Sequence, residues 1–156
     1  MRPSPLEMVI PSTSPAWRII LRAEVAELVR LTEWIEHFAQ QAKLPPDQAF
    51  AIQLCVEEAV VNVIMHSGVA ENGQPITLEL AASGYDVTAV IEDKGRPFDP
   101  TTVPPHSKPA SLKDAEIGKL GVHLMRDFAS EIRYERRNGH NRLTLKFNAA
   151  EPVSKE

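Results

Sequence analysis

The stretch Glu58-Ala59-Val60-Val61-Asn62-Val63-Ile64-Met65-His66 is apolar at almost every position between its ends. A helix that is apolar nearly all round is expected to be buried. Glu58 and Asn62 interrupt this pattern four residues apart, so a helix stacks their side chains on one face. Because an unpaired buried carboxylate is costly, this face either meets backbone or arginine partners or lines a ligand cavity. The sequence favours the cavity.

Elements on either side of this stretch follow from periodicity and turn residues. Two helices are predicted, over Glu24–Lys43 and from about Asp47 to His66, with Pro45-Pro46 between them and Ser67-Gly68 as the stop. Paired strands are predicted on each side of a third helix, since alternating runs flank Ser83-Gly84 and Asn138-Gly139. The remaining predicted elements are a strand at Trp17–Arg22, strands at Pro75–Ala82 and Tyr85–Glu92, a helix at Gly118–Ala129, and strands at Glu131–Arg137 and Asn141–Phe147.

The order β-α-α-β-β-loop-α-β-β predicts an α+β fold, a two-layer α/β sandwich. We expect one mixed, mostly antiparallel sheet with helices on one face. Residues 1–15, rich in Pro and Ser, are predicted to be a flexible lead-in, residues 16–148 one domain, and residues 149–156 a polar tail.

Composition excludes several classes of function. The chain has 156 residues, a net charge of -4 and a pI near 5.8, which suit a single globular domain and disfavour direct nucleic-acid binding. Its one cysteine, Cys55, excludes an internal disulfide and a cysteine zinc site, and is expected to be a buried thiol. No signal peptide and no run of about 18 apolar residues are recognised, so we expect a cytoplasmic protein without a membrane span.

Two further segments carry chemistry. Asp93-Lys94-Gly95 follows a predicted strand, where Asp93 can accept a hydrogen bond from an exocyclic amine such as that of adenine. Gly95 would let the backbone approach the ring closely. Gly118-Lys119-Leu120-Gly121 opens a helix, whose free N–H groups and dipole suit phosphate. Lys119 adds a positive charge.

Glu58 and Asn62 carry side chains that suit a metal ion and a proton transfer. The Asn62 amide offers a neutral oxygen to a hard cation, and Mg²⁺ takes few protein ligands beside phosphates and water. Glu58, one turn earlier, can orient or deprotonate an attacking hydroxyl or water. Glu57 is expected at the rim, and His66 as a helix cap or a neighbour of the site.

Together these segments resemble the GHKL ATPase superfamily over roughly Trp17 to Phe147. Glu58-Ala59-x-x-Asn62-x-x-x-His66 is similar to its N box, Asp93-x-Gly95-x-Pro97-Phe98-Asp99 to its first glycine box, and Gly118-x-Leu120-Gly121 to its second. The resemblance is greatest to anti-sigma-factor serine kinases of the RsbW and SpoIIAB type. Lys119 stands where those proteins usually have a glycine, and Ile117 where a polar or basic residue is common.

The resemblance implies a Bergerat-type fold that binds ATP and Mg²⁺. It makes Glu58 the catalytic base, Asn62 the magnesium ligand and Asp93 the adenine contact. It makes residues 101–116 the ATP lid. The remaining nucleotide contacts would be Gly95, Phe98, Gly118, Lys119, Leu120, Gly121 and Val122.

The implied function is a serine/threonine kinase and anti-sigma factor that phosphorylates a STAS-domain antagonist, binds a sigma factor or similar regulator, and forms a homodimer. The alternative is a non-catalytic, nucleotide-binding partner-switching module. A histidine-kinase fragment is disfavoured because no helix pair with an acceptor histidine precedes the domain.

Overall fold

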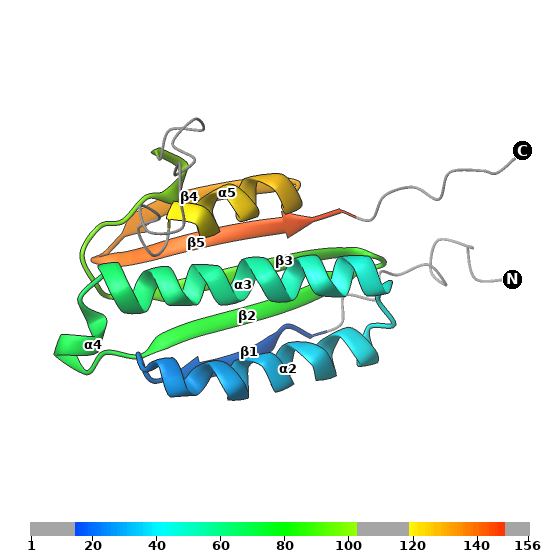
Figure 1. Cartoon of the computed structure of the whole chain (residues 1–156), viewed down its shortest axis with the longest axis horizontal. Helices are drawn as coiled ribbons and strands as arrows, with labels where there is room; N and C mark the ends of the chain where they lie inside the picture. The colour runs from blue at the N-terminus through cyan, green and yellow to red at the C-terminus, as the bar shows by residue number, and fades with distance from the viewer. Residues whose placement is uncertain (1–14, 103–118, 149–156) are drawn as a thin grey trace, which may run out of the picture.

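A computed structural model describes residues 15–102 and 119–148 of the chain. Its sheet has five strands in the order β1-β2-β3-β5-β4 (Figure 1). The strands are β1 (Trp17–Leu21), β2 (Ile76–Ser83), β3 (Asp86–Asp93), β4 (Glu131–Arg137) and β5 (His140–Phe147). The helices are η1 (Val25–Glu27), α2 (Leu28–Gln41), α3 (Pro46–His66), α4 (Val69–Asn72), η2 (Pro100–Thr102) and α5 (Lys119–Phe128).

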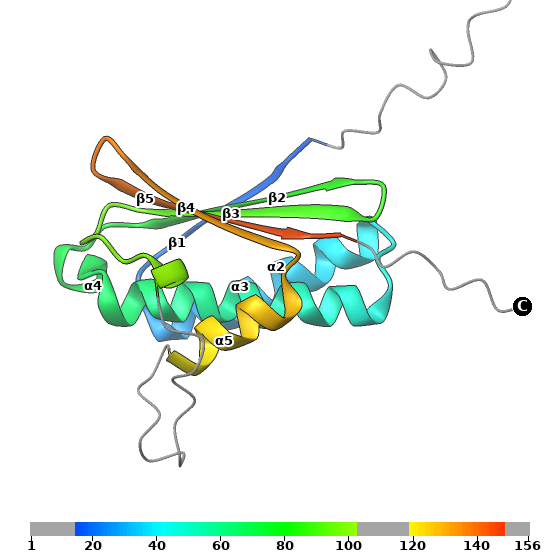
Figure 2. The same ribbon diagram turned by 90° about the horizontal axis from the view of Figure 1, so that it is seen from above.

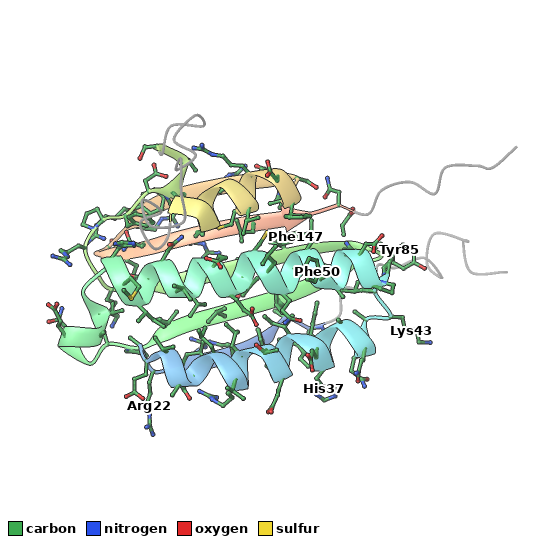
Figure 3. The ribbon with its side chains drawn as sticks, viewed as in Figure 1. Arg22, His37, Lys43, Phe50, Tyr85 and Phe147 are labelled. Atoms are coloured by element: carbon green, nitrogen blue, oxygen red, sulfur yellow. The ribbon has the colours of Figure 1, made fainter. Side chains whose placement is uncertain are left out.

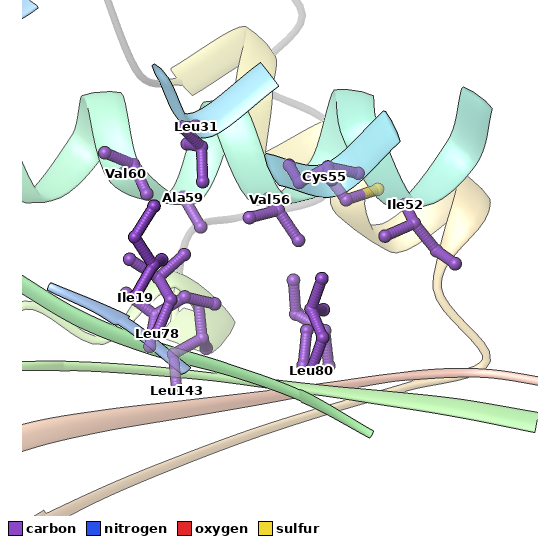
Figure 4. Close-up of a cluster of buried hydrophobic side chains, with 14 of the residues drawn as sticks. Ile19, Leu31, Ile52, Cys55, Val56, Ala59, Val60, Leu78, Leu80 and Leu143 are labelled. Carbon is purple, nitrogen blue, oxygen red and sulfur yellow. The ribbon is translucent and has the colours of Figure 1, made fainter. Parts of the chain in front are cut away.

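The molecule has two layers. Figure 2 shows α2, α3 and α5 on one face of the twisted sheet, as the α+β prediction required. Strands alternate between buried and more exposed residues, so every second side chain points toward the helices. On β2 these are Ile76, Leu78 and Leu80, all at most 1% exposed. They meet the apolar face of α3, including Ile52 and Val56, to form the core (Figure 4).

The sheet is not mixed, because all four strand pairings among the described residues are antiparallel. Two helices, α2 and α3, separate β1 from β2, so the chain reverses three times and β2 runs against β1. A single long helix, α5, separates β3 from β4, which gives these strands the same direction. They do not pair, since β5 lies between them. The predicted sheet is therefore correct in being mostly antiparallel and wrong in being mixed, and the inserted strand β5 is the reason.

Both hairpin turns lie close to where the sequence predicts them. Asn138-Gly139 forms the second turn with φ values of 54° and 76°, as a two-residue hairpin turn of the primed type requires. The first turn is Gly84-Tyr85 rather than Ser83-Gly84, because β2 continues through Ser83. The strand ends are thus shifted by one residue. The short helix α4 was not predicted.

Both ends of α3 are fastened to the sheet. In its first turn, Gln48 donates to the carbonyl of Phe147 at 3.2 Å and to that of Tyr85. Figure 3 shows Tyr85 and Phe147 near this end of the helix. At the other end, the Ser67 carbonyl accepts the backbone N–H of Arg96 at 2.7 Å. The helix that carries Glu58 and Asn62 is therefore held in a fixed position above β3 and β5.

α3 also passes a length and hydropathy test for a membrane span, with a mean hydropathy of 1.4 over its most apolar window. The expectation that no segment is long and apolar enough was therefore too strict. In the structure α3 is the central helix of the core, with buried residues that include Ile52, Val56 and Val60. Its apolar character is explained by packing against the sheet and the neighbouring helices.

Candidate functional site

A pocket of about 360 Å³, counting its open mouth, lies between the C-terminal half of α3, the end of β3 and the β4–β5 hairpin. Most of its walls are apolar, with a few polar side chains between them, as in sites that orient a ligand. The lining residues are Ala59, Asn62, Val63, Ser67, Ile91, Asp93, Phe98, Pro100, Met125, Tyr134, Asn141 and Leu143.

Asn62 is the unusual wall residue. Its side chain is 2% exposed, and neither Oδ1 nor Nδ2 has a hydrogen-bond partner among the described residues. Buried polar groups are nearly always paired, so an orphaned amide needs an explanation. Its position at the pocket wall provides one, because a bound ligand or cation can supply the missing partner. The alternative of a backbone or arginine partner, which the sequence left open, is not observed for Asn62 in the described part of the chain.

Asp93 lies across the pocket at the last inward position of β3 and is 4% exposed. Its Oδ1 accepts the backbone N–H of Gly95 at 2.8 Å and the Nδ2 of Asn141 at 3.0 Å. Asn141 is directly opposite Asp93 in the β3–β5 register. The pocket therefore holds a buried acceptor whose orientation is set by its neighbours.

Gly95 does not line the pocket but makes the turn after Asp93 possible. A Cβ at this position would lie 2.3 Å from the Ser67 carbonyl oxygen and 2.4 Å from the Ser67 Cβ. The residue is not in the left-handed region of backbone space. Glycine is therefore required here by close contact with the end of α3. This contact within the protein is a second reason for glycine, and the close approach to a ligand ring stays a prediction.

Gly95→Ala is expected to destabilise the fold by about 3 kcal/mol, because neither the Ser67 backbone nor the turn can move without breaking the Arg96–Ser67 hydrogen bond. Urea unfolding monitored by circular dichroism measures this cost. Gly84→Ala is the matched control: it has a φ of 61° but no neighbour within 4 Å, so its cost comes from the backbone alone. Equal stabilities of the Gly95→Ala variant and the wild type would contradict the steric argument.

Glu58 lies one turn before Asn62 and does not line the pocket itself. Burial, and secondarily the Glu57 carboxylate, raise the pKa of Glu58 above its ordinary value. Burial, and secondarily the Glu58 carboxylate, raises the pKa of the Cys55 thiol to about 12. Cys55 is therefore an inert buried thiol, as predicted, and its Sγ lies 3.8 Å from the Leu124 carbonyl oxygen of α5. Glu58 thus lies on the side of α3 that faces α5.

Glu57 is not a freely solvated residue. It is half-buried and accepts a hydrogen bond from Thr32 Oγ1 of α2. The two adjacent carboxylates therefore have different surroundings. Glu57 faces α2, while Glu58 lies on the side of α3 that faces α5.

The glycine segment is only partly described. Lys119, Leu120, Gly121 and Val122 form the first turn of α5, whose leading N–H groups have no partner within the helix. Figure 1 shows that α5 begins above the C-terminal half of α3. These positions are helical rather than a loop before the helix. Gly118 lies outside the described residues, as does all of the predicted lid, 101–116, except Thr101 and Thr102.

Phe98 and Pro100, the first residue of η2, line the pocket after the end of β3. The Phe98 ring stacks on His66 at 5.4 Å between centroids, with 19° between the planes. Arg126 of α5 donates to the Thr101 carbonyl oxygen at 2.9 Å, which fastens η2 to α5. His66 is thus a neighbour of the site through its ring.

Among the lining residues missed from the sequence are two polar side chains of the β4–β5 hairpin, Asn141 and Tyr134. The signal was present for Asn141: it shares the buried face of β5 with Leu143, Leu145 and Phe147, where an apolar residue is expected. Tyr134 had no comparable signal, since a tyrosine fits any half-buried strand position.

The described side chains suit a metal ion that takes most of its coordinating atoms from a bound small molecule. No group of three or more His, Cys, Asp or Glu side chains that could hold a metal ion occurs within residues 15–102 and 119–148. The orphaned Asn62 oxygen supplies one hard ligand, and Mg²⁺ commonly takes its other ligands from phosphates and water. The donor set therefore suits Mg²⁺ together with a nucleotide and does not suit a metal held by the protein alone.

Comparison with known proteins identifies this architecture. The family model for the histidine kinase-like ATPase domain matches residues 21–147. The chain is 35% identical over 119 residues to the serine/threonine-protein kinase BtrW of Bordetella bronchiseptica, covering 75% of this chain and 82% of BtrW.

Two solved structures share the fold. One contains the RsbU and RsbW domains of Rv1364c from Mycobacterium tuberculosis, with a TM-score of 0.65 and 17% identity over 89% of this chain and 34% of that one. The other is the histidine kinase domain of a blue-light activated histidine kinase from Erythrobacter litoralis, with a TM-score of 0.50 and 19% identity over 78% and 59% of the two chains. Our chain therefore spans about a third of the first and less than two thirds of the second.

These findings confirm the resemblance to the GHKL superfamily and the predicted Bergerat-type fold. An ATPase domain of this kind binds ATP. The chain therefore belongs to the histidine kinase-like ATPase domain family, and within it to the relatives of the serine/threonine-protein kinase BtrW, so it is an ATP-binding enzyme domain of the kinase type.

Proposed function

We propose that this protein transfers the γ-phosphoryl group of Mg·ATP to a serine or threonine of a STAS-domain protein. The observation that carries the proposal is the orphaned Asn62 amide, which shares one pocket with the buried Asp93 carboxylate. The amide suits the metal end of a nucleotide, and the carboxylate suits the amino group of its base. The relation to BtrW supports phosphoryl transfer to a protein hydroxyl.

Each residue has a task in the proposed reaction. Asp93 accepts a hydrogen bond from the adenine amino group, and Phe98, which lines the same pocket, packs beside the base. Asn62 holds Mg²⁺, which when bound neutralises phosphate charge. The first turn of α5, with Lys119, lies at the phosphates.

Glu58 takes the proton of the attacking hydroxyl. The hydroxyl oxygen bonds to the γ-phosphorus, the bond from that phosphorus to the β–γ bridging oxygen breaks, and ADP leaves. Phosphoryl transfer depends mostly on positioning and charge neutralisation, so these few residues suffice.

A labelling experiment tests the proposal. The protein is incubated with Mg-[γ-³²P]ATP and a cognate STAS-domain protein, and the product is divided between acid and neutral conditions. We expect label that survives acid, because a phosphoserine or phosphothreonine ester is acid-stable and phosphohistidine is not. The control is the same STAS protein with its labelled residue changed to alanine. Acid-labile label, or none, would contradict the serine/threonine kinase assignment.

The proposed partners follow from the same reasoning. We propose that the protein also binds a sigma factor or similar regulator, forms a homodimer and works in the cytoplasm. Exposed apolar side chains at one edge of the molecule support protein contacts, namely Ile20, Val25 and Val29, each more than half exposed. ATP binding without any labelled product would favour the non-catalytic partner-switching module instead.

Glu57→Gln is expected to move the acid limb of the pH–rate profile to lower pH. A general base must be deprotonated to act, so a raised pKa of Glu58 moves the acid limb to higher pH than an ordinary glutamate would give. Removing the Glu57 charge removes the second cause of that shift and leaves burial, the first cause. Single-turnover rates from pH 4.5 to 8 measure the limb. Thr32→Val is the matched control, because it removes the hydrogen bond to Glu57 but keeps its charge. A limb that is unmoved in Glu57→Gln would argue against Glu58 as the base.

A further inference from the structure

The Asn141 amide is fully occupied by protein partners. Its Nδ2 donates to Asp93 Oδ1 at 3.0 Å and to the Arg96 carbonyl oxygen at 2.7 Å. Its Oδ1 accepts from the Tyr134 hydroxyl at 2.5 Å and from Arg136 Nη1 at 3.0 Å. An amide side chain offers two donors and two acceptor lone pairs, so none is left for a ligand. Asn141 lines the pocket and yet acts through its neighbours.

Three of these partners permit only one orientation of the amide. The Asp93 carboxylate and the Arg96 carbonyl can only accept, so they require the NH₂ group. Arg136 can only donate, so it requires the oxygen. The Tyr134 hydroxyl does both and does not decide. Arg136 also donates to the Gly95 carbonyl oxygen at 2.9 Å, so the β4–β5 hairpin holds the turn at two points.

These hydrogen bonds fix which carboxylate oxygen of Asp93 is available to a ligand in the pocket. The hydrogen bonds from Gly95 and Asn141 both end on Oδ1, which prevents the carboxylate from turning. No hydrogen bond ends on Oδ2 within the part of the chain that the structure describes, so this oxygen remains as an acceptor. An acceptor pairs with the 6-amino group of adenine and repels the carbonyl oxygen of a 6-oxopurine.

We propose that Asn141, oriented by Arg136, is a positioning residue that aims Asp93 at the base and makes the site selective for 6-aminopurine over 6-oxopurine nucleotides. The proposal rests on the proposed function, in which Asp93 contacts the adenine amino group. It adds that the selectivity is set from β4 and β5, by residues that do not touch the nucleotide.

The test compares ATP with inosine triphosphate, whose base carries oxygen in place of the amino group. Calorimetry on the full chain with Mg²⁺ gives both dissociation constants for the wild type, Asn141→Leu and Arg136→Met. We expect Asn141→Leu to weaken ATP binding about tenfold, the loss of one charge-assisted hydrogen bond, while binding of inosine triphosphate is unchanged. Arg136→Met should lower the ATP preference less, because Tyr134 still holds the amide.

A matched control and a second variant keep the outcomes distinct. Arg133→Met removes another exposed arginine of β4, one paired only with Glu131 among the described residues, and should leave the preference unchanged. If Asn141→Leu fails to fold by circular dichroism, Arg136→Met decides, since Arg136 is exposed and its removal leaves the core intact.

An equal loss of both nucleotides in the deciding variant would mean a merely structural role and would overturn the proposal. A folded variant that keeps the wild-type preference for ATP would also overturn the proposal. If Asp93→Asn nevertheless abolished that preference, the proposed function would stand. A wild type without any ATP preference would refute the adenine contact of Asp93, and this proposal with it.

Discussion

Asn62→Leu should abolish the Mg²⁺ dependence of ATP binding and at the same time stabilise the protein without nucleotide. The Asn62 amide is buried with both polar atoms unpaired among the described residues. Desolvation of this amide therefore destabilises the protein when no nucleotide is bound. Leucine has no polar atoms to desolvate, and we expect a gain of about 1–2 kcal/mol in the free energy of unfolding. The same change removes the proposed metal ligand, and Mg·ATP affinity should fall by about 100-fold or more.

Two measurements on one protein check this prediction. Urea unfolding without nucleotide gives the stability, and calorimetry with and without Mg²⁺ gives the affinities. Asn62→Asp is the matched control, because it keeps an oxygen for the cation but buries a charge: it should retain the Mg²⁺ dependence and lose stability. A leucine variant with wild-type Mg·ATP affinity would refute the metal assignment. One that loses both affinity and stability would make Asn62 a structural residue.

Glu58→Gln should lower phosphoryl transfer to the STAS protein by about 10²- to 10⁴-fold, the usual contribution of a general base. Glutamine keeps the size and shape of the side chain but cannot accept the proton. ATP binding should be unchanged, because Glu58 does not line the pocket. Burial raises the pKa of Glu58 above its ordinary value, which makes the ionised carboxylate a stronger base.

Single-turnover labelling separates this loss from a loss of binding. Glu57→Gln is the control at the alkaline plateau of the profile: it removes the adjacent carboxylate, which faces α2, and should keep most of the rate. Calorimetry of both variants with ATP completes the comparison. If Glu58→Gln transferred phosphate at the wild-type rate, another group would have to be the base. If it lost ATP binding, Glu58 would be part of the nucleotide site.

The pocket itself was partly foreseen. Asn62, Asp93 and Phe98 were singled out from the sequence, and the structure brings them to one pocket although 30 or more residues separate Asn62 from the other two. Asn62 was detectable because a polar residue in an apolar helix breaks a local pattern. Gly95 was also singled out, but its contact with Ser67 could not be predicted, since close packing between distant segments has no local signature.

By itself the sequence determined the features that short stretches of chain decide. The apolar period of α3, the prolines before it, and the Asn138-Gly139 turn each act through backbone preferences and side-chain burial over a few residues. Tertiary structure alone decided that β5 lies between β3 and β4, because strand order is set by which long-range pairing buries most surface. That choice places Asn141 opposite Asp93 and brings Arg136 to the turn. The orientation of the proposed adenine contact is therefore a product of strand register, which the residues around Asp93 do not encode.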